Sequence, residues 1–233
     1  MIVGLLSFYN ESPAMLAACT SSLSPMIDHL IAVDGPYALY PNSSPTSPAD
    51  QASTIRDVCQ AHGIGVTIHQ PPHPWAGNEI EKRTFMFRLA ETITSEDDWY
   101  YIADADEQVT HLHADPRTEL ASTDLDTAEV TYWWHRPQRT PEDLPFATPL
   151  REQQGITKFF RAVRGLHCDG THYRYVTPDG RILWNGSSPC EPPHDLRAIR
   201  VQHRNQERDL WRQQEAADYY KRRDLNRIEQ VPV

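Results

Sequence analysis

The first hundred residues alternate between short apolar runs and segments with helical spacing. Strands are expected at residues 2–8, 29–33, 66–69 and 99–103, and helices at residues 13–23, 49–62 and 79–93. Unbroken apolar runs are typical of strands that are buried on both faces of a parallel sheet. The alternation of strand and helix therefore predicts an α/β fold with a mostly parallel sheet flanked by helices.

Local signals agree with these helix boundaries. Ser12 followed by Pro13 is a capping residue followed by a first-turn proline, and Gly63 is suited to end the second helix. In the third helix Phe85, Leu89 and Ile93 are spaced by four and form one apolar stripe. Asn78 is a plausible cap for that helix.

The second half of the chain is less regular. Strands are expected at residues 128–135, 158–161, 173–176, 182–184 and 199–202, with a hairpin turn at residues 178–181. A long charged helix is expected from Asn205 to about Glu229. With no repeat and no clear linker, we expect one domain over residues 1–233, divided into a first part (1–110), a second part (111–204) and a helical tail (205–233).

Composition narrows the function classes. The chain has 233 residues, 39% of them hydrophobic, so it can bury a core. Its formal net charge of −10 argues against a protein that mainly binds a nucleic-acid backbone.

The four cysteines are widely spaced and include no CxxC pair, which argues against structural zinc. Free thiols in a reducing cytoplasm are the simplest interpretation, and a Cys168–Cys190 bridge stays open. The apolar N-terminus lacks a basic segment, and no apolar run reaches membrane-spanning length. We therefore expect a soluble cytoplasmic protein of a microbial or virus-infected cell, without stable membrane insertion.

Polar residues follow each expected parallel strand, and ligands bind beyond the carboxyl ends of such strands. Asp104 and Asp106 come directly after the fourth strand and can aim two carboxylates at one point. Mg²⁺ and Mn²⁺ prefer oxygen ligands, so the pair is a candidate metal site. Taken alone, an Asp-x-Asp triplet such as residues 104–106 is more often a solvated acidic turn than a metal site.

Four segments together resemble the GT-A glycosyltransferases, most of all family 2. These are the opening strand with Tyr9-Asn10-Glu11, then Val33-Asp34-Gly35, then residues 77–83, and finally residues 101–107. The resemblance implies a GT-A (nucleotide-diphospho-sugar transferase) fold. It also implies a metal-dependent transferase that moves a sugar from a UDP- or GDP-sugar to a hydroxyl acceptor, with Mn²⁺ or Mg²⁺ as cofactor.

The same resemblance implies roles for the donor-binding residues. Ser7, Tyr9 and Glu11 would surround the base and ribose, and Asp34 would contact the base or its ribose. Lys82 or Arg83 would contact the base, a phosphate or the sugar. For each of these two, an exposed helix face paired with neighbouring glutamates is a competing interpretation.

Metal-binding roles follow from the resemblance as well. Asp104 would meet ribose and metal, Asp106 the metal, and His203 would be a third ligand, with Arg208 as a diphosphate contact. His111 and His113 are rivals to His203, although their alternation also fits a half-exposed strand.

The catalytic base is left open by the sequence. Family 2 relatives often follow a Lys-x-Phe-Arg strand with His-Glu, whereas here Lys158-Phe159-Phe160-Arg161 is followed by His172-Tyr173. Asp169 or Glu191 could replace the glutamate, with His172 beside them as a further candidate, or a retaining reaction could use the leaving diphosphate as base. Candidates for an aromatic acceptor wall are Trp133, Trp134, His172 and Tyr173, with Trp75 on the donor side; a core position is the alternative for each tryptophan.

Three other functions remain as alternatives. A sugar-phosphate nucleotidyltransferase normally has a glycine-rich phosphate loop after its first strand, and residues 7–11 contain no glycine. A degenerate, non-catalytic GT-A domain is the second, and a metal hydrolase, for which no HExxH motif exists, is the third. The acceptor could be a glycan, a lipid-linked sugar, a protein or a modified nucleobase.

Overall fold

An eight-stranded mixed sheet forms the centre of the computed structural model, which describes residues 1–40, 44–76, 79–113, 115–135, 151–170, 174–186 and 188–229. The strand order is β3-β2-β1-β4-β7-β6-β11-β5. The strands are β1 (Ile2–Ser7), β2 (His29–Val33), β3 (Gly65–His69), β4 (Trp99–Asp104), β5 (Glu107–Leu112), β6 (Thr127–His135), β7 (Arg151–Arg161) and β11 (His194–His203). Strands β3, β2, β1 and β4 are parallel neighbours, so their carboxyl ends meet at one edge.

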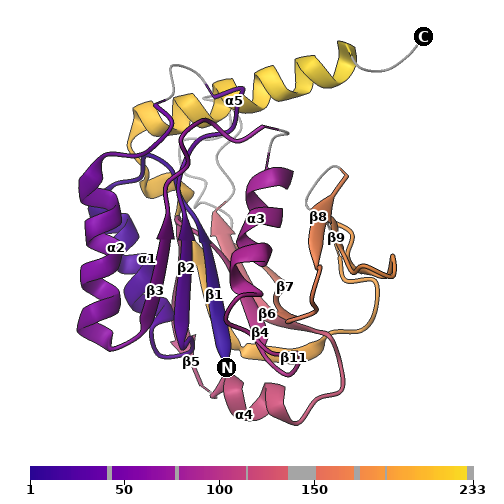
Figure 1. Cartoon of the computed structure of the whole chain (residues 1–233). Helices are drawn as coiled ribbons and strands as arrows, with labels where there is room; N and C mark the ends of the chain where they lie inside the picture. Colours follow the sequence, from indigo (N-terminus) through magenta and orange to yellow (C-terminus); the bar gives the residue numbers. More distant parts are fainter. Residues whose placement is uncertain are drawn as a thin grey trace.

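Helices cover both faces of the sheet (Figure 1). Helices α1 (Pro13–Leu23) and α2 (Ala49–His62) pack on one face and α3 (Ile80–Ala90) on the other, each over its own cluster of buried apolar side chains. The short α4 (Pro116–Ala121) lies near the amino ends of the parallel strands, and α5 (Leu210–Glu229) runs across their carboxyl ends (Figure 1). A second sheet of order β10-β9-β8 is built from β8 (His167–Asp169), β9 (Arg174–Val176) and β10 (Ile182–Trp184).

The fold class expected from the sequence is confirmed. The α/β alternation, the mostly parallel sheet between helices and the long C-terminal helix are all present. Within the described residues, β5, β8 and α4 were not predicted, and the long helix begins at Leu210 rather than at the expected Asn205, after a 3-10 turn at Asn205–Glu207. β5 has only one buried residue, so its sequence lacks the apolar run that marks the parallel strands.

The boundaries of the first two helices agree with the sequence signals, and the end of the third differs. The Ser12 hydroxyl accepts a hydrogen bond from the Met15 N–H, and Gly63 ends α2 with a left-handed φ of 68°. α3 begins at Ile80 and ends at Ala90, three residues before the expected Ile93; the expected cap, Asn78, lies outside the described residues.

Cys19, Cys59, Cys168 and Cys190 are free, so the optional Cys168–Cys190 bridge is not formed. Within the described residues, no helix combines the length and apolarity needed to span a membrane.

Candidate functional site

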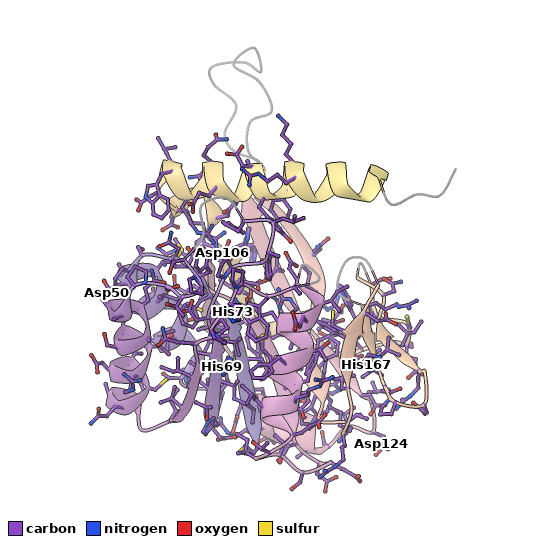
Figure 2. The ribbon with its side chains drawn as sticks, turned by 45° about the horizontal axis from the view of Figure 1, so that its top comes forward. Asp50, His69, His73, Asp106, Asp124 and His167 are labelled. Atoms are coloured by element: carbon purple, nitrogen blue, oxygen red, sulfur yellow. The ribbon has the colours of Figure 1, made fainter. Side chains whose placement is uncertain are left out.

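A polar pocket of about 200 Å³ opens at the carboxyl ends of β1, β2 and β4, beneath α5. Figure 2 shows Asp106 under this helix. The structure brings nine of the residues singled out in the sequence to the pocket wall: Ser7, Tyr9, Glu11, Lys82, Arg83, Asp104, Asp106, His203 and Arg208. They meet because parallel strands end at the same edge and because α5 returns across that edge.

Asp104 is the last residue of β4 and faces α3. Its Oδ1 accepts a hydrogen bond from Arg83 Nη2 at 2.7 Å, and its N–H donates to Glu107 Oε2 at 3.1 Å. Burial acts to raise the pKa of Asp104, but the positive charge of Arg83 outweighs it and holds the pKa below its ordinary value. Asp104 is therefore an ionised carboxylate at neutral pH.

Asp106 is almost fully buried and is held by β11 and by the chain leading into α5. Its Oδ2 lies 2.9 Å from His203 Nε2 and 3.0 Å from Arg208 Nη1. Burial acts to raise the pKa of Asp106, yet the hydrogen bond from His203 and the charge of Arg208 hold it well below its usual range. The same hydrogen bond raises the pKa of His203 against the opposing effect of burial.

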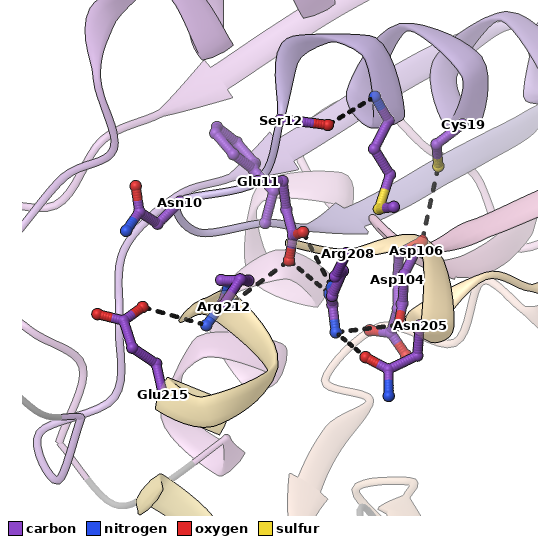
Figure 3. A network of polar contacts seen from close by, with 12 residues as sticks. Asn10, Glu11, Ser12, Cys19, Asp104, Asp106, Asn205, Arg208, Arg212 and Glu215 are labelled. Carbon is purple, nitrogen blue, oxygen red and sulfur yellow. Dashed lines mark hydrogen bonds and ion pairs between the residues drawn. The ribbon is translucent and has the colours of Figure 1, made fainter. Parts of the chain in front are cut away.

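One guanidinium links two acidic residues of the pocket. Arg208 donates from Nε to Glu11 Oε2 at 2.9 Å and from Nη2 to the other oxygen of Glu11, while its Nη1 reaches Asp106 (Figure 3). Arg212, one helical turn further on, lies 3.4 Å from Glu11 Oε1 and donates to the Tyr40 hydroxyl. The start of α5 is thus anchored on the carboxylates of the pocket.

Lys82 forms the floor of the pocket. Its Nζ donates to the carbonyl of Phe8 at 2.8 Å and to that of Gly35 at 2.9 Å, so it ties together the chain segments that leave β1 and β2. The side chain is only 1% exposed, and burial lowers its pKa to about 7. Its two carbonyl contacts need two N–H donors, which the neutral amine also supplies.

Several pocket residues were missed by sequence reasoning. Tyr40 stacks on Tyr219 of α5 with ring centroids 5.1 Å apart, Tyr37 lies 5.3 Å from Tyr219, and Tyr9 packs edge-on against Tyr40. A signal for the α5 contribution exists, because positions 212, 216 and 219 are spaced for one face of a helix and all line the pocket.

Asp34 does not line the pocket. Its fully buried carboxylate accepts hydrogen bonds from the N–H of Gly35, the N–H and hydroxyl of Ser47, and the side-chain amide of Gln70. The expected contact with a base or ribose would require these bonds to break. Trp75 is also structural here: it is buried against His69 and Phe85 and donates from Nε1 to the Asp34 carbonyl at 2.7 Å.

Of the candidate catalytic residues, Asp169 and Glu191 do not line the pocket. Asp169 lies on β8 and forms a two-point ion pair with Arg174, and Glu191 is exposed after β10. His172 and Tyr173 lie outside the described residues.

Trp133, His111 and His113 also lie apart from the pocket lining. Trp133 is half-buried on β6, and the side chain of Trp134 is outside the described part. His111 and His113 are exposed, with ring centroids 5.5 Å apart at the end of β5. The spacing of His111 and His113 therefore reflects a half-exposed strand, the competing interpretation given for this pair.

The residues suit a divalent cation in type, though their side chains are engaged with one another. Over the described parts of the chain, no group of three or more His, Cys, Asp or Glu side chains is arranged to hold a metal ion. Yet Asp106 Oδ2 and His203 Nε2 are 2.9 Å apart, close to the separation of about 3 Å between adjacent ligand atoms in octahedral coordination. Arg83 pairs with Oδ1 of Asp104 and Arg208 with Oδ2 of Asp106, so a cation would compete with these two guanidinium groups for the carboxylates.

Comparisons with known proteins leave the family open. No protein-family model and no curated protein matches the sequence. Among solved structures, a putative glucose-1-phosphate thymidylyltransferase from Bacillus anthracis, in complex with a sucrose, is similar over 70% of this chain and 72% of that chain, with a TM-score of 0.41 and 10% identity. A likeness of that extent supports no inference about function.

Proposed function

We propose that the protein is a glycosyltransferase that moves a sugar from a nucleoside-diphosphate sugar to a hydroxyl group, with a divalent cation as cofactor. One observation supports this proposal above the others: two ionised aspartates and a histidine share a small pocket with three arginines and a lysine. A diphosphate needs positive charge, a divalent cation needs carboxylates, and the pocket offers both within one wall.

The cationic side chains would bind the donor. Arg208, two residues before α5, and Arg212, in its first turn, both present guanidinium groups to the pocket, and planar guanidinium is well matched to phosphate oxygens. Arg83 presents positive charge from the opposite wall, and Lys82 lies at the floor of the pocket. The tyrosines between these walls supply apolar faces against which a base or a sugar can pack.

Asp104, Asp106 and His203 would hold the cation. When bound, such a cation supplies Lewis-acid chemistry that offsets the charge on the departing nucleoside diphosphate. The residues of this chain orient the donor, and α5, which lies over the pocket, limits access of water. The acceptor would be a hydroxyl group of a glycan, a lipid-linked sugar, a protein or a modified base.

The proposal is tested by a calorimetric screen of UDP-, GDP-, CDP- and dTDP-sugars with and without Mn²⁺. We expect one nucleotide class to bind in a metal-dependent way and Asp106→Ala to abolish that binding. Absence of metal-dependent binding to all four classes would overturn the proposal. For the donor that binds, NMR of the product's anomeric configuration would separate an inverting from a retaining reaction.

The same pocket could serve a sugar-phosphate nucleotidyltransferase, and a second assay separates the two activities. Incubation with a nucleoside triphosphate and a sugar 1-phosphate should yield no pyrophosphate if the chain is a glycosyltransferase. Pyrophosphate release that is lost in Asp106→Ala would replace the proposed function with the alternative.

A further inference from the structure

Glu107, the residue after the acidic pair, is buried below the turn that carries Asp104 and Asp106. The side chain is 5% exposed, and its Oε2 accepts a hydrogen bond from the Asp104 N–H at 3.1 Å. Glu107 therefore points back into the protein and closes the turn between β4 and β5 with its own carboxylate.

Two neighbouring strands hold this carboxylate from the other side. Lys158 of β7 forms an ion pair with Glu107 Oε1, and the hydroxyl of Tyr132 on β6 donates to the same oxygen at 2.8 Å. Lys158 is 7% exposed, and its Nζ lies 5.3 Å from the centre of the Tyr132 ring. Three donors from three strands thus converge on one buried carboxylate.

The other end of the turn is fixed by β11. The Arg204 N–H donates to the Asp106 carbonyl at 2.7 Å, directly after His203, whose ring contacts the Asp106 side chain. With the Asp104 N–H and the Asp106 carbonyl both held, the two aspartate side chains are left to face the pocket.

A buried ion pair of this kind is a weak source of net stability, because desolvation offsets most of the attraction and apolar residues could fill the same space. What an apolar pair could not provide is the acceptor for the Asp104 N–H. The contacts of Glu107 therefore fix the backbone geometry of the turn that carries Asp104 and Asp106, which apolar packing alone would not do.

We propose that Glu107 and Lys158 are positioning residues that hold Asp104 and Asp106 in the orientation needed for a divalent cation and the diphosphate of the donor. This inference rests on the proposed function. It assigns to the buried pair a contribution to ligand affinity that is separate from its contribution to folding.

The test uses two variants and one matched control in the full chain. Glu107→Met/Lys158→Met removes both charges together, so that neither is left buried without a partner. Tyr132→Phe removes one hydrogen bond to Glu107 and leaves the ion pair. Tyr101→Phe is the control, because the Tyr101 hydroxyl is also buried in the sheet and, among the described residues, has no hydrogen-bond partner. For each protein, calorimetry measures the affinity for the UDP- or GDP-sugar with and without Mn²⁺, and the thermal unfolding midpoint is recorded.

We expect the double variant to lose about tenfold in Mn²⁺-dependent affinity, as when hydrogen bonds behind metal ligands are removed. Tyr132→Phe should lose about fivefold, the value of one hydrogen bond, with a normal unfolding midpoint. Metal-free nucleotide binding should stay unchanged in both variants, and Tyr101→Phe should match the wild type throughout.

Two results would overturn the inference alone: variants that bind as tightly as the wild type, or variants that lose metal-free binding by the same factor. If the double variant does not fold, Tyr132→Phe decides between these outcomes. A wild-type protein that shows no metal-dependent binding at all would overturn the proposed function, and this inference with it.

Discussion

Arg208 Nη1 and Asp106 Oδ2 are 3.0 Å apart on the wall of the pocket, and the same guanidinium also pairs with Glu11. The arginine thus lies against a carboxylate that we assign to the cation. Because a cation and the Arg208 guanidinium are both positive and would share one carboxylate, they repel each other and compete for Asp106. A diphosphate, by contrast, would attract Arg208 away from Asp106.

This competition predicts opposite effects of Arg208→Ala on two ligands. Affinity for Mn²⁺ alone should increase, because Asp106 loses its competing partner, and affinity for the nucleotide-sugar with Mn²⁺ should fall about tenfold, because one charge-assisted contact to phosphate is lost. Calorimetry with each ligand measures both. Arg197→Ala, which removes an equal but exposed charge on β11, is the control. A parallel loss of both affinities would contradict the competition.

Asp34 differs from Asp106 in what surrounds its carboxylate. The Asp34 carboxylate is fully buried, lies outside the pocket lining and accepts hydrogen bonds from Gly35, Ser47 and Gln70, whereas Asp106 lines the pocket. Asp34→Ala should therefore lower the free energy of unfolding by about 3 kcal/mol, because several buried donors lose their acceptor. Urea denaturation measures the loss, and Asp50→Ala, at an exposed position in the first turn of α2, should change it little. A stable Asp34→Ala protein that has lost only nucleotide binding would show that Asp34 contacts the ligand.

The first half of the fold could be predicted because most of its strands are unbroken apolar runs. The runs at 29–33 and 99–103 are unmistakable as buried parallel strands, and the parallel arrangement alone places Ser7, Asp34 and Asp104 at one edge. By contrast, β5 and β8 carry mixed or very short patterns and contribute few buried residues.

For the site, the sequence predicted which strand ends come together but not which side chains meet there. No local pattern states that Arg208 will meet Glu11, 197 positions earlier, or that Lys158 will meet Glu107, 51 positions earlier. Sequence also cannot tell a carboxylate that faces a pocket from one whose lone pairs are already used, and this is why Asp34 and Asp106 looked alike. Such distinctions depend on tertiary contacts.

Lys82 should make stability depend on pH. Burial lowers its pKa to about 7, whereas an unfolded lysine titrates near about 10.4, so the unfolded chain binds more protons between these values. The free energy of unfolding should therefore rise with pH across this window, by about 1 kcal/mol per unit between pH 7.5 and 9.5. Urea denaturation at several pH values measures the slope. In Lys82→Met this contribution should vanish, and in Lys221→Met, at an exposed position of α5, it should persist. Equal slopes in all three proteins would contradict the assignment.

Tyr219 should hold α5 over the pocket. Its ring is 1% exposed and stacks on Tyr40, so removing it leaves α5 attached mainly through Arg208 and Arg212. Tyr219→Ala should cost about 3 kcal/mol of local packing, which favours detachment of the helix rather than unfolding of the sheet. Trypsin should then cleave after Lys221 much faster, and a saturating nucleotide-sugar with Mn²⁺ should restore protection, because a diphosphate would bind both arginines. Trp211→Ala, a half-exposed aromatic of the same helix, should leave the cleavage rate near that of the wild type. A Tyr219→Ala protein that resists trypsin like the wild type would show that the ion pairs alone keep α5 in place.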